Sequence, residues 1–531
     1  MGRRWLALMA LLVASLGALA AYQFREARTG GGRGERLVLA WGDWGQPNPF
    51  SFYPRGPGYV VTSLIFDTLV WKDEDGLIPW LAESWSVSPN GTVYTFRLRE
   101  GVRWHDGEPL TARDAAFTFN YLREKGWRWK NVDPSLILGA EAPDDMTLLI
   151  RLSRPFPLFL ETYASTVFII PEHVWSRVDD PFTYVEPDSF IGSGPYVLEE
   201  YEPGVGYRLR ANEHYFAGRP AYAELELKAI ADPNTVAAAI RQGQVQSASF
   251  WGGQVRLVRQ LQEAVQGLRV QEGDTYWVLY LDFNHASWPT NVTEFRRAVA
   301  HALNLTEVVE RSVGLEAAVV GNPGYLPPYS PWYNPDVPLY DYDPDAALRG
   351  LADLGISDVD GDGRLELPSG EDLRLRLVTV AQFVQEARLV AEQLGRIGIS
   401  VEVRALSDFT QLDEASRSGD YDLMISGHGA TGNDPLGFIW YFSRWGAAPW
   451  DNGTYRAALS ELASSRSVEE LARVVDGLQV IVAQNLPQIP LYYPKTYVVS
   501  RPEVVVEWFF THMGIDGGIP LPFNKLALLR G

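Results

Sequence analysis

Four polar side chains that could do acid–base chemistry lie close together in the segment 101–122: His105, Asp106, Glu108 and Asp114. Imidazole and carboxyl groups are the usual general acids and bases of enzymes, and they also bind metal ions. Because the same residue types are common at turns and helix starts, the neighbouring residues decide between chemistry and architecture.

The residues around this group favour architecture. Alternating apolar residues in the stretch 93–98 predict a strand with one face turned inward, and the turn pair Asp106-Gly107 follows it. Thr111 is a good N-cap for a helix, and Asp114 stands three residues later, as in a capping box. The segment therefore predicts a strand, a turn and a capped helix rather than an active site.

A second acidic group could bind a metal ion. The loop 357–370 carries four acidic residues: Asp358, Asp360, Asp362 and Glu366. Their spacing matches the first part of a calcium-binding loop, with Glu366 at its ninth position. Its twelfth position is Ser369 rather than the usual glutamate. We expect either a structural calcium ion that clips this loop or a solvated turn.

Catalytic motifs are absent from the sequence. It contains no His-Glu-x-x-His helix, no Gly-x-Ser-x-Gly elbow and no cysteine, and its seven histidines are scattered. A glycosidase needs only two carboxylates, which sequence spacing cannot exclude in a chain with 66 acidic residues. We predict that the protein is not an enzyme, with an exported glycoside hydrolase as the less favoured alternative.

Length and composition narrow the class of protein. A chain of 531 residues is too long for one core, so we expect several domains. The 46 basic and 66 acidic residues give a net charge of −20, which repels phosphate backbones and argues against a nucleic-acid partner. Aromatic residues make up 12% of the chain, which favours a ligand cleft lined with rings.

The N-terminus predicts export. Arg3 and Arg4 precede an apolar run, 5–19, that is shorter than the roughly 20 residues of a membrane span. We interpret residues 1–20 as a signal peptide or an N-terminal anchor, and 21–35 as a flexible tether. The mature protein is then periplasmic or on the cell surface, with tethering to the membrane as an alternative. An exported chain without cysteine has no disulfides, so core burial must stabilise it.

Four segments in order are similar to the signatures of the family 5 extracellular solute-binding proteins: 81–122, 191–204, 295–328 and 341–355. These are the receptors of oligopeptide, dipeptide, nickel and some oligosaccharide ABC importers. The segment 384–404 then reads as a helix followed by a strand, an α/β unit. A surface-layer or adhesive role without transport remains a second alternative.

The resemblance implies an α/β, type II periplasmic-binding-protein fold with two hinged lobes plus an auxiliary domain. Lobe I would be discontinuous, built from 36–67, 190–272 and 490–531. The auxiliary domain would fill 68–189, and lobe II would run over 273–489. In that family the auxiliary domain does not normally hold the ligand, which agrees with a structural role for His105 and its neighbours.

Aromatic and polar residues at the ends of predicted strands are candidates for ligand contact, because α/β sheets bind ligands at the carboxyl ends of their strands. Trp41 and Trp44 follow the first predicted strand, and Trp251 ends a later one. Tyr280 and Asn284 lie in a segment that we expect to cross between the lobes.

The segment 426–446 carries the remaining candidates. In peptide-binding relatives a similar loop holds an aspartate that pairs with the ligand's α-ammonium, and the resemblance implies that role for Asp434, beside Asn433. Trp440 and Trp445 follow, and such rings stack on sugar faces as readily as on peptide side chains. Leu436 stands where an acidic or polar residue is common in the relatives, so a sugar ligand stays open.

We therefore predict the substrate-binding protein of an ABC importer. It would capture a short peptide in a cleft between the lobes and deliver it to the membrane permease. A short oligosaccharide of the cellobiose type is the alternative ligand. We expect a monomer with no cofactor apart from the calcium alternative.

Overall fold

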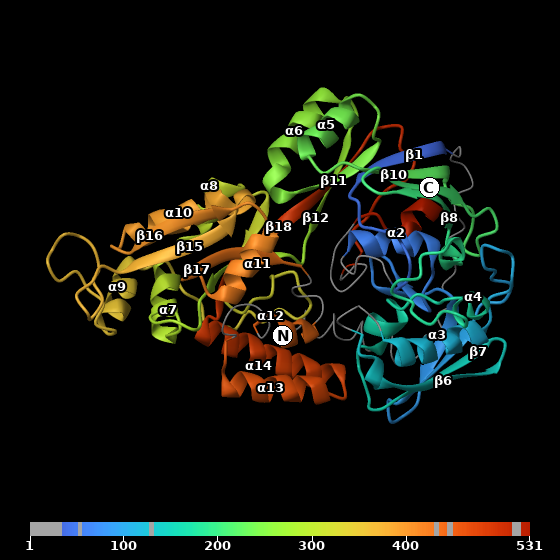
Figure 1. Ribbon diagram of the computed structural model, residues 1–531, viewed down its shortest axis with the longest axis horizontal. Coiled ribbons are helices and arrows are strands. Elements are labelled where there is room, and N and C mark those ends of the chain that lie inside the picture. The colour runs from blue at the N-terminus through green and yellow to red at the C-terminus, as the bar shows by residue number, and fades with distance from the viewer. Residues whose placement is uncertain are drawn as a thin grey trace.

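The computed structural model describes residues 34–50, 56–126, 132–429, 435–442, 450–511, 514 and 522–530. Within them the chain forms one large mixed sheet, a separate four-stranded sheet, a short hairpin and helices that pack on their faces (Figure 1). None of the helices in these ranges combines the length and the apolar character that a bilayer crossing requires.

The large sheet consists of two groups of strands joined through β18 (Gln488–Ser500). Residues of β18 up to Pro494 pair with β13 and β14, whereas those from Lys495 onward pair with β11 and β12. We call the two groups the first and the second half-sheet.

The first half-sheet contains β1 (Gly34–Trp41), β8 (Tyr196–Glu202), β9 (Gly206–Ala211), β10 (Tyr222–Ala229), β11 (Ser247–Trp251) and β12 (Arg269–Asp274). Its helices are α2 (Pro57–Ile65), α5 (Pro233–Arg241), α6 (Val255–Ala264) and α15 (Lys525–Arg530). The strands β10 and β11 run parallel to β1, so the carboxyl ends of all three lie at one edge.

The second half-sheet contains β13 (Val278–Phe283), β14 (Ala318–Val320), β15 (Arg374–Val380), β16 (Ser400–Leu406) and β17 (Leu423–His428). Its helices are α7 (Thr293–Ala302), α8 (Leu305–Ser312), α9 (Pro344–Ala352), α10 (Val384–Gly395), α11 (Phe409–Ser418), α12 (Phe438–Tyr441), α13 (Gly453–Ser464) and α14 (Val468–Asn485). Because β15 runs parallel to both β16 and β17, their carboxyl ends also share one edge.

A small domain lies between β1 and β8 in the sequence. Its four strands are β4 (Ala82–Val87), β5 (Val93–Leu98), β6 (Ile137–Asp144) and β7 (Thr147–Leu152), with helices α3 (Ala112–Lys125) and α4 (Glu172–Trp175) and a hairpin of β2 (Val70–Lys72) and β3 (Leu77–Pro79). The alternation predicted along β5 is confirmed, because Tyr94, Phe96 and Leu98 are buried.

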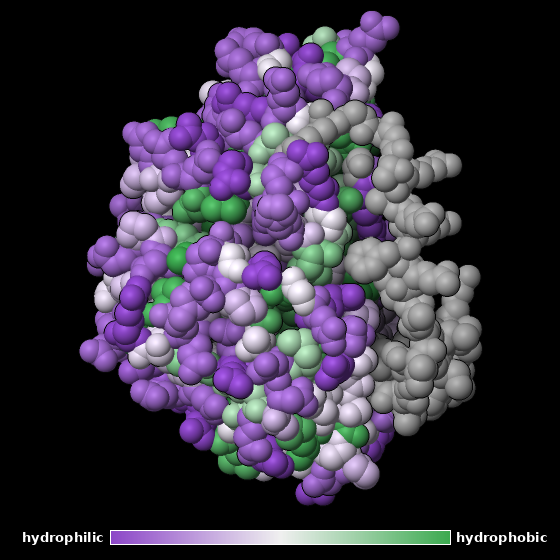
Figure 2. All heavy atoms as spheres, turned by 90° about the vertical axis from the view of Figure 1, so that its right-hand side faces the viewer, coloured by the Kyte–Doolittle hydropathy of each residue, from purple (hydrophilic) through white to green (hydrophobic). Residues whose placement is uncertain are grey.

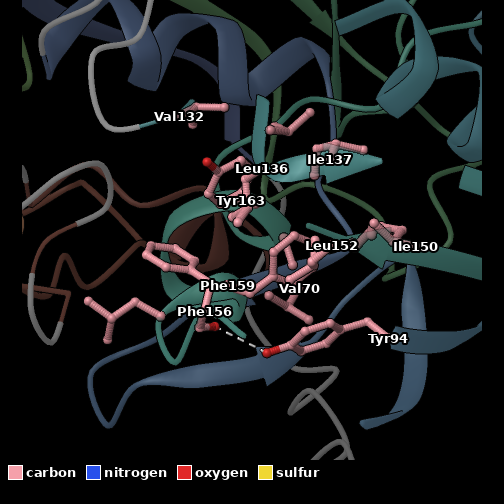
Figure 3. Packing of buried hydrophobic residues seen from close by; sticks show 14 of the residues in the cluster. Val70, Tyr94, Val132, Leu136, Ile137, Ile150, Leu152, Phe156, Phe159 and Tyr163 are labelled. Atoms are coloured by element: carbon pink, nitrogen blue, oxygen red, sulfur yellow. Dashed lines mark hydrogen bonds between the residues drawn. The ribbon is translucent and has the colours of Figure 1, made fainter. Parts of the chain in front are cut away.

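The small domain has an aromatic core, which Figure 3 shows from close by. The ring centroids of Tyr94 and Phe159 lie 4.4 Å apart, and the Tyr94 hydroxyl donates to the Phe156 carbonyl over 3.3 Å. Packed rings of this kind supply much of the burial energy of a domain without disulfides. The same cluster of buried side chains continues into α12–α14 of the second half-sheet.

The glycines of the segment 191–204 have a steric reason. A Cβ on Gly192 or Gly194 would overlap the backbone at the end of α2, and the Gly194 amide donates to the Ile65 carbonyl over 2.8 Å. Only glycine lets the chain pass this close as it returns from the small domain to the first half-sheet.

Two segments connect the half-sheets. One is residues 275–277, between β12 and β13, and the other is the middle of β18. They lie side by side, because the Thr275 hydroxyl donates to the Pro494 carbonyl. In Figure 1 both occupy the middle of the molecule, between the yellow-orange part and the blue-green part. Two parts joined by so few segments can rotate about them as a hinge.

The face shown in Figure 2 is mostly hydrophilic, with hydrophobic residues in small separate patches.

Candidate functional site

The group around His105 is structural. The Gly192 amide donates to Nδ1 of His105 over 3.3 Å, and Nε2 lies 3.0 Å from the Gly194 carbonyl. These partners fix a neutral ring with its hydrogen on Nε2. Burial lowers the pKa of His105, which keeps the ring neutral. His105 therefore ties the turn of the small domain to the returning chain.

Asp114 caps α3 as the sequence predicts. Its Oδ2 accepts from the Thr111 amide over 2.9 Å, and the Thr111 hydroxyl accepts from the Arg113 amide, which completes the capping box. Its Oδ1 accepts from the Glu172 amide at the start of α4. Glu108 is exposed, and Asp106 pairs with His173 over 2.8 Å.

The loop 357–370 brings its four acids together. The side-chain oxygens of Asp358, Asp360, Asp362 and Glu366 lie within 4.8 Å of one another, close enough to share one cation. All four also accept hydrogen bonds from backbone amides inside the loop, such as Gly361 and Gly363 to Asp358. The loop is thus preformed by turn hydrogen bonds, and oxygen ligands of this kind suit calcium.

Trp41, the last residue of β1, and Trp44 lie at the carboxyl edge of the first half-sheet. Trp41 is buried in the core, where its ring meets Phe523 edge-on at 5.2 Å. Trp44 is half-buried, and its amide donates to the Tyr207 hydroxyl over 2.9 Å. The exposed Asp43 between them accepts from the Tyr201 hydroxyl and the Gly204 amide, which fixes this loop against β8 and β9.

An aromatic row crosses between the two half-sheets. Trp251, at the end of β11, is 43% exposed and lies 5.9 Å from Trp277 in the connecting segment. Trp277 lies 6.0 Å from Phe383 after β15, and Phe383 lies 6.3 Å from Phe409 after β16, which is also 43% exposed. The four rings therefore bring the carboxyl edges of the two half-sheets together at the hinge.

Of these four rings, the sequence predicts only Trp251 as a ligand contact. Trp277, Phe383 and Phe409 each stand next to a strand end, which was the signal that could have identified them. Partly exposed rings at the carboxyl edge of an α/β sheet are where ligand contact is expected.

Tyr280 within β13 and Asn284 just after it have different surroundings. Tyr280 is buried, and its ring centroid lies 5.5 Å from that of His428 at the carboxyl end of β17. Asn284 is buried at the far end, where its amide donates to the carbonyls of Gly419 and Tyr421. The contacts of Asn284 are those of a residue that holds the chain before β17.

His428 joins an aromatic group under the end of β17. Its ring stacks on Tyr441 of α12 with centroids 4.7 Å apart, and its Nε2 lies 3.0 Å from the Tyr325 hydroxyl. Tyr325 also packs edge-on against Phe442 at 4.9 Å. These contacts tie β17 to α12, the elements on either side of the segment 430–434.

The other predicted contact residues lie outside the described residues. Asn433, Asp434 and Trp445 fall in the ranges that the structure leaves out, and so does the side chain of Trp440. Their roles stay predictions from the sequence.

Two hollows in the described part of the chain lie elsewhere. One, of about 290 Å³, is lined by Arg36, Lys228 and Gln246 near the amino end of β11. The other, of about 280 Å³, lies beside α7 and α8. Neither touches the edge where the aromatic row lies.

Comparison with known proteins identifies the family. The model of the bacterial extracellular solute-binding proteins, family 5 Middle, matches residues 76–450. The oligopeptide-binding protein AppA of Bacillus subtilis is 25% identical over 496 residues, which cover 88% of this chain and 87% of that protein.

Solved structures share the fold. The Bacillus subtilis protein AppA in complex with a nonapeptide aligns with a TM-score of 0.70 at 23% identity, covering 88% of this chain and 95% of that one. An oligopeptide ABC transporter, periplasmic oligopeptide-binding protein from Thermotoga maritima, with mannohexaose bound, also gives 0.70 at 23% identity, covering 94% and 98%.

The sequence-based expectation of an α/β, type II periplasmic-binding-protein fold is confirmed by these alignments. The family model covers well over half of the 531 residues. This chain therefore belongs to the family 5 bacterial extracellular solute-binding proteins.

Proposed function

We propose that this protein captures a short peptide between its two half-sheets and delivers it to the membrane permease of an ABC importer. The observation that carries the proposal is the match of the family model to residues 76–450. The family is one of binding proteins and not of enzymes, so the glycoside hydrolase alternative is not retained.

A peptide is the favoured ligand because of the name and the solved complex of a relative. The Bacillus subtilis relative is named an oligopeptide-binding protein and has been solved with a nonapeptide. Asp434, as the sequence resemblance implies, would supply the carboxylate for the peptide's ammonium, next to Asn433. A carboxylate facing an ammonium is a strong and charge-specific contact.

An oligosaccharide is the second candidate. The Thermotoga maritima relative has been solved with mannohexaose, and the aromatic row at the hinge offers rings on which sugar faces stack. In either case we propose that the ligand contacts Trp251, Trp277 and the edge of β17, with Trp440 and Trp445 as further stacking rings.

A division of the chain into two lobes would form a cleft that opens and closes about a hinge. We propose lobe I as 36–67, 190–272 and 490–531, the auxiliary domain as 68–189, and lobe II as 273–489. The connecting segments at Thr275 and Pro494 would then be the hinge.

We further propose that the protein acts as a monomer outside the cytoplasmic membrane, and that residues 1–35 serve as an export signal or a membrane tether.

A calorimetric screen tests the ligand class. The purified protein is titrated with a panel of peptides of two to nine residues and with cello- and manno-oligosaccharides. Micromolar or tighter binding of one class selects between the two candidates, because specific solute receptors reach such affinities. If both classes fail to bind under all conditions, or if a panel member is cleaved with multiple turnovers, the proposal is wrong.

We also propose that the loop 357–370 holds a structural calcium ion through Asp358, Asp360, Asp362 and Glu366. The support is their spacing in the sequence and the 4.8 Å grouping of their oxygens. A ligand that binds only the folded state raises the melting temperature. Calcium should therefore raise it, an Asp360→Asn variant should lose that rise, and magnesium should give a smaller one. An equal melting temperature with calcium and with chelator would leave only a solvated turn.

A further inference from the structure

A contact between the two half-sheets lies beside the hinge. On the side of the first half-sheet it is made by Gly252, Gly253 and helix α6, which follow β11. On the side of the second half-sheet it is made by residues 313–317, which join α8 to β14. In Figure 1, α6 and α8 lie on the same, upper side of β18, whereas α13, α14 and the small domain lie below it. The contact therefore spans the hinge on the upper side only.

Small and apolar residues let the two sides approach closely. The Ala317 carbonyl accepts from the Lys495 amide of β18 over 2.8 Å, and a Cβ on Gly252 would overlap that carbonyl oxygen. Ala317 is fully buried in a cluster that also contains Val258 of α6. Val313 packs against this cluster and against the core of the second half-sheet. The apolar cores of the two half-sheets are therefore continuous at this contact.

An ion pair completes the contact. Nη2 of Arg259 on α6 lies 2.9 Å from Oε1 of Glu316, and 58% and 48% of the two side chains are exposed. The Tyr497 hydroxyl of β18 donates to the Glu316 carbonyl over 3.1 Å, which fixes the backbone beside the pair. Among the ion pairs that the described residues form, no other joins the two half-sheets. The charges of Arg259 and Glu316 thus attract each other across the hinge.

Rotation of the half-sheets about the hinge must alter this contact. The parts below β18 belong to the same two bodies as α6 and residues 313–317, because the small domain returns to the first half-sheet and α13 and α14 cover the second. A rotation that changes the spacing of the lower parts therefore also changes the spacing of Arg259 and Glu316. An ion pair favours the arrangement in which it forms, because the attraction falls as the charges separate.

We propose that Arg259 and Glu316 form a brace across the hinge, which stabilises the arrangement of the half-sheets in this structure. The two residues are then positioning residues for solute binding, because they act on the half-sheets and not on the solute. A protein divided between two arrangements binds a solute with an affinity that depends on the fraction in the competent one. This effect on affinity rests on the proposed function, whereas the brace itself does not.

The brace is tested without solute, by the distances between spin labels on Arg208→Cys in β9 and Glu414→Cys in α11. Both positions are exposed, one belongs to each half-sheet, and neither belongs to the contact. Glu316→Arg places two like charges together. The arrangement of this structure should then lose about two- to fivefold in population relative to other arrangements, the range that exposed ion pairs allow. Arg259→Gln removes the same pair and serves if Glu316→Arg does not fold.

Exchanging the two charges separates electrostatics from packing. Arg259→Glu combined with Glu316→Arg rebuilds a pair of opposite charges and should restore the wild-type label distances. Asp145→Arg is the control, because it reverses one charge of an exposed pair with Arg113, 3.2 Å apart, inside the small domain. The control should leave the label distances unchanged. Wild-type distances in the folded Glu316→Arg or Arg259→Gln protein, or an exchanged pair that does not restore them, would overturn the proposal.

The effect on solute binding is measured separately, by calorimetry with tri-alanine and with cellotriose. The affinity of the probe that binds should change by about two- to fivefold in Glu316→Arg and return with the exchanged pair. If the affinity is equal in all the folded proteins, Arg259 and Glu316 are not positioning residues, although the receptor role stands. If neither probe binds, the ligand classes of the proposed function fail, and the label distances alone decide whether the brace exists.

Discussion

Asp67 shows how one buried carboxylate holds separate parts of this chain together. It accepts from Trp80 of the small domain over 2.7 Å, from Ser193 in the returning segment over 2.9 Å and from Tyr215 over 2.8 Å. Lys525 of α15 pairs with it, and both side chains are fully buried. The ammonium also lies 4.2 Å from the centre of the Trp71 ring. A buried charge of this kind depends on all of its partners.

Removing the partner charge should therefore be costly. Lys525→Met should lower the free energy of unfolding by about 3–5 kcal/mol, because Asp67 is left as a buried anion without a counter-charge. Denaturant unfolding measures the loss. Arg113→Met removes an arginine from an exposed pair with Asp145 and should cost less than about 1 kcal/mol. A double change, Asp67→Asn with Lys525→Met, should cost less than Lys525→Met alone; an equal or larger cost would contradict the charge argument.

Replacing Asp434 should distinguish a peptide ligand from a sugar ligand. If it binds an ammonium in a closed cleft, Asp434→Asn leaves a desolvated cation unpaired and should cost about 3–5 kcal/mol of binding, more than a hundredfold in affinity. A neutral sugar would lose only a charge-assisted hydrogen bond, about 1.5–3 kcal/mol. Calorimetric titration of both proteins, beside a thermal melt, separates these outcomes. Unchanged affinity with an unchanged melt would mean that Asp434 is a turn residue.

Asp282 predicts a pH dependence of stability. Its pKa in the folded protein is raised to about 7 from the ordinary 3.8, so between these values the folded state holds a proton that the unfolded chain has lost. Protonated Asp282 therefore contributes its whole stabilisation of the folded state below about pH 4. This stabilisation is lost as the pH rises toward 7. Asp282→Asn should flatten this part of the stability profile measured by denaturant unfolding. An unaltered slope in the variant would contradict the prediction.

Among the secondary-structure elements, a glycine in one strand leaves the space that a neighbouring aromatic ring occupies. Gly427 lies in β17, directly beneath the Trp277 ring, and a Cβ there would overlap that ring. Trp277 in turn contacts Trp251 across the hinge. The aromatic row therefore depends on a residue without a side chain in a neighbouring strand.

Filling that space should disturb both stability and binding. Gly427→Val should displace the Trp277 ring and lower the free energy of unfolding by about 1–3 kcal/mol, the usual cost of overpacking. It should also weaken binding of the best ligand from the screen. Gly477→Ala in α14, where a Cβ meets nothing within 4 Å, is the control, and should raise stability by roughly 0.5–1 kcal/mol. Wild-type affinity in a folded Gly427→Val protein would exclude the aromatic row from the binding site.

For the whole molecule, the arrangement of two half-sheets about β18 predicts closure on binding. The chain has no cysteine, so labels can be placed at chosen sites only. Spin labels on Glu263→Cys in α6 and Glu414→Cys in α11, both exposed, should move closer together when ligand is added. Labels on Glu263→Cys and Arg208→Cys, both in the first half-sheet, should keep their distance. An unchanged distance in the first pair at saturating ligand would rule out hinge closure.

Some of this structure is fixed by local sequence. The capping box of Thr111 and Asp114 and the alternation along β5 depend on residues within one turn or one strand, so their interpretation needed no tertiary information. The absence of disulfides and the family also followed from the sequence, because composition and ordered motifs are properties of the chain itself.

The contacts at the candidate site were decided by tertiary structure. Trp277, Phe383 and Phe409 stand apart in the sequence and meet only because the carboxyl edges of two half-sheets come together at the hinge. Likewise, Tyr325 meets His428 and Gln488 only because three distant segments come together in the fold. Spacing along a chain predicts which side chains share a strand or helix face, whereas strand pairing between distant segments determines which side chains can share a ligand or a proton.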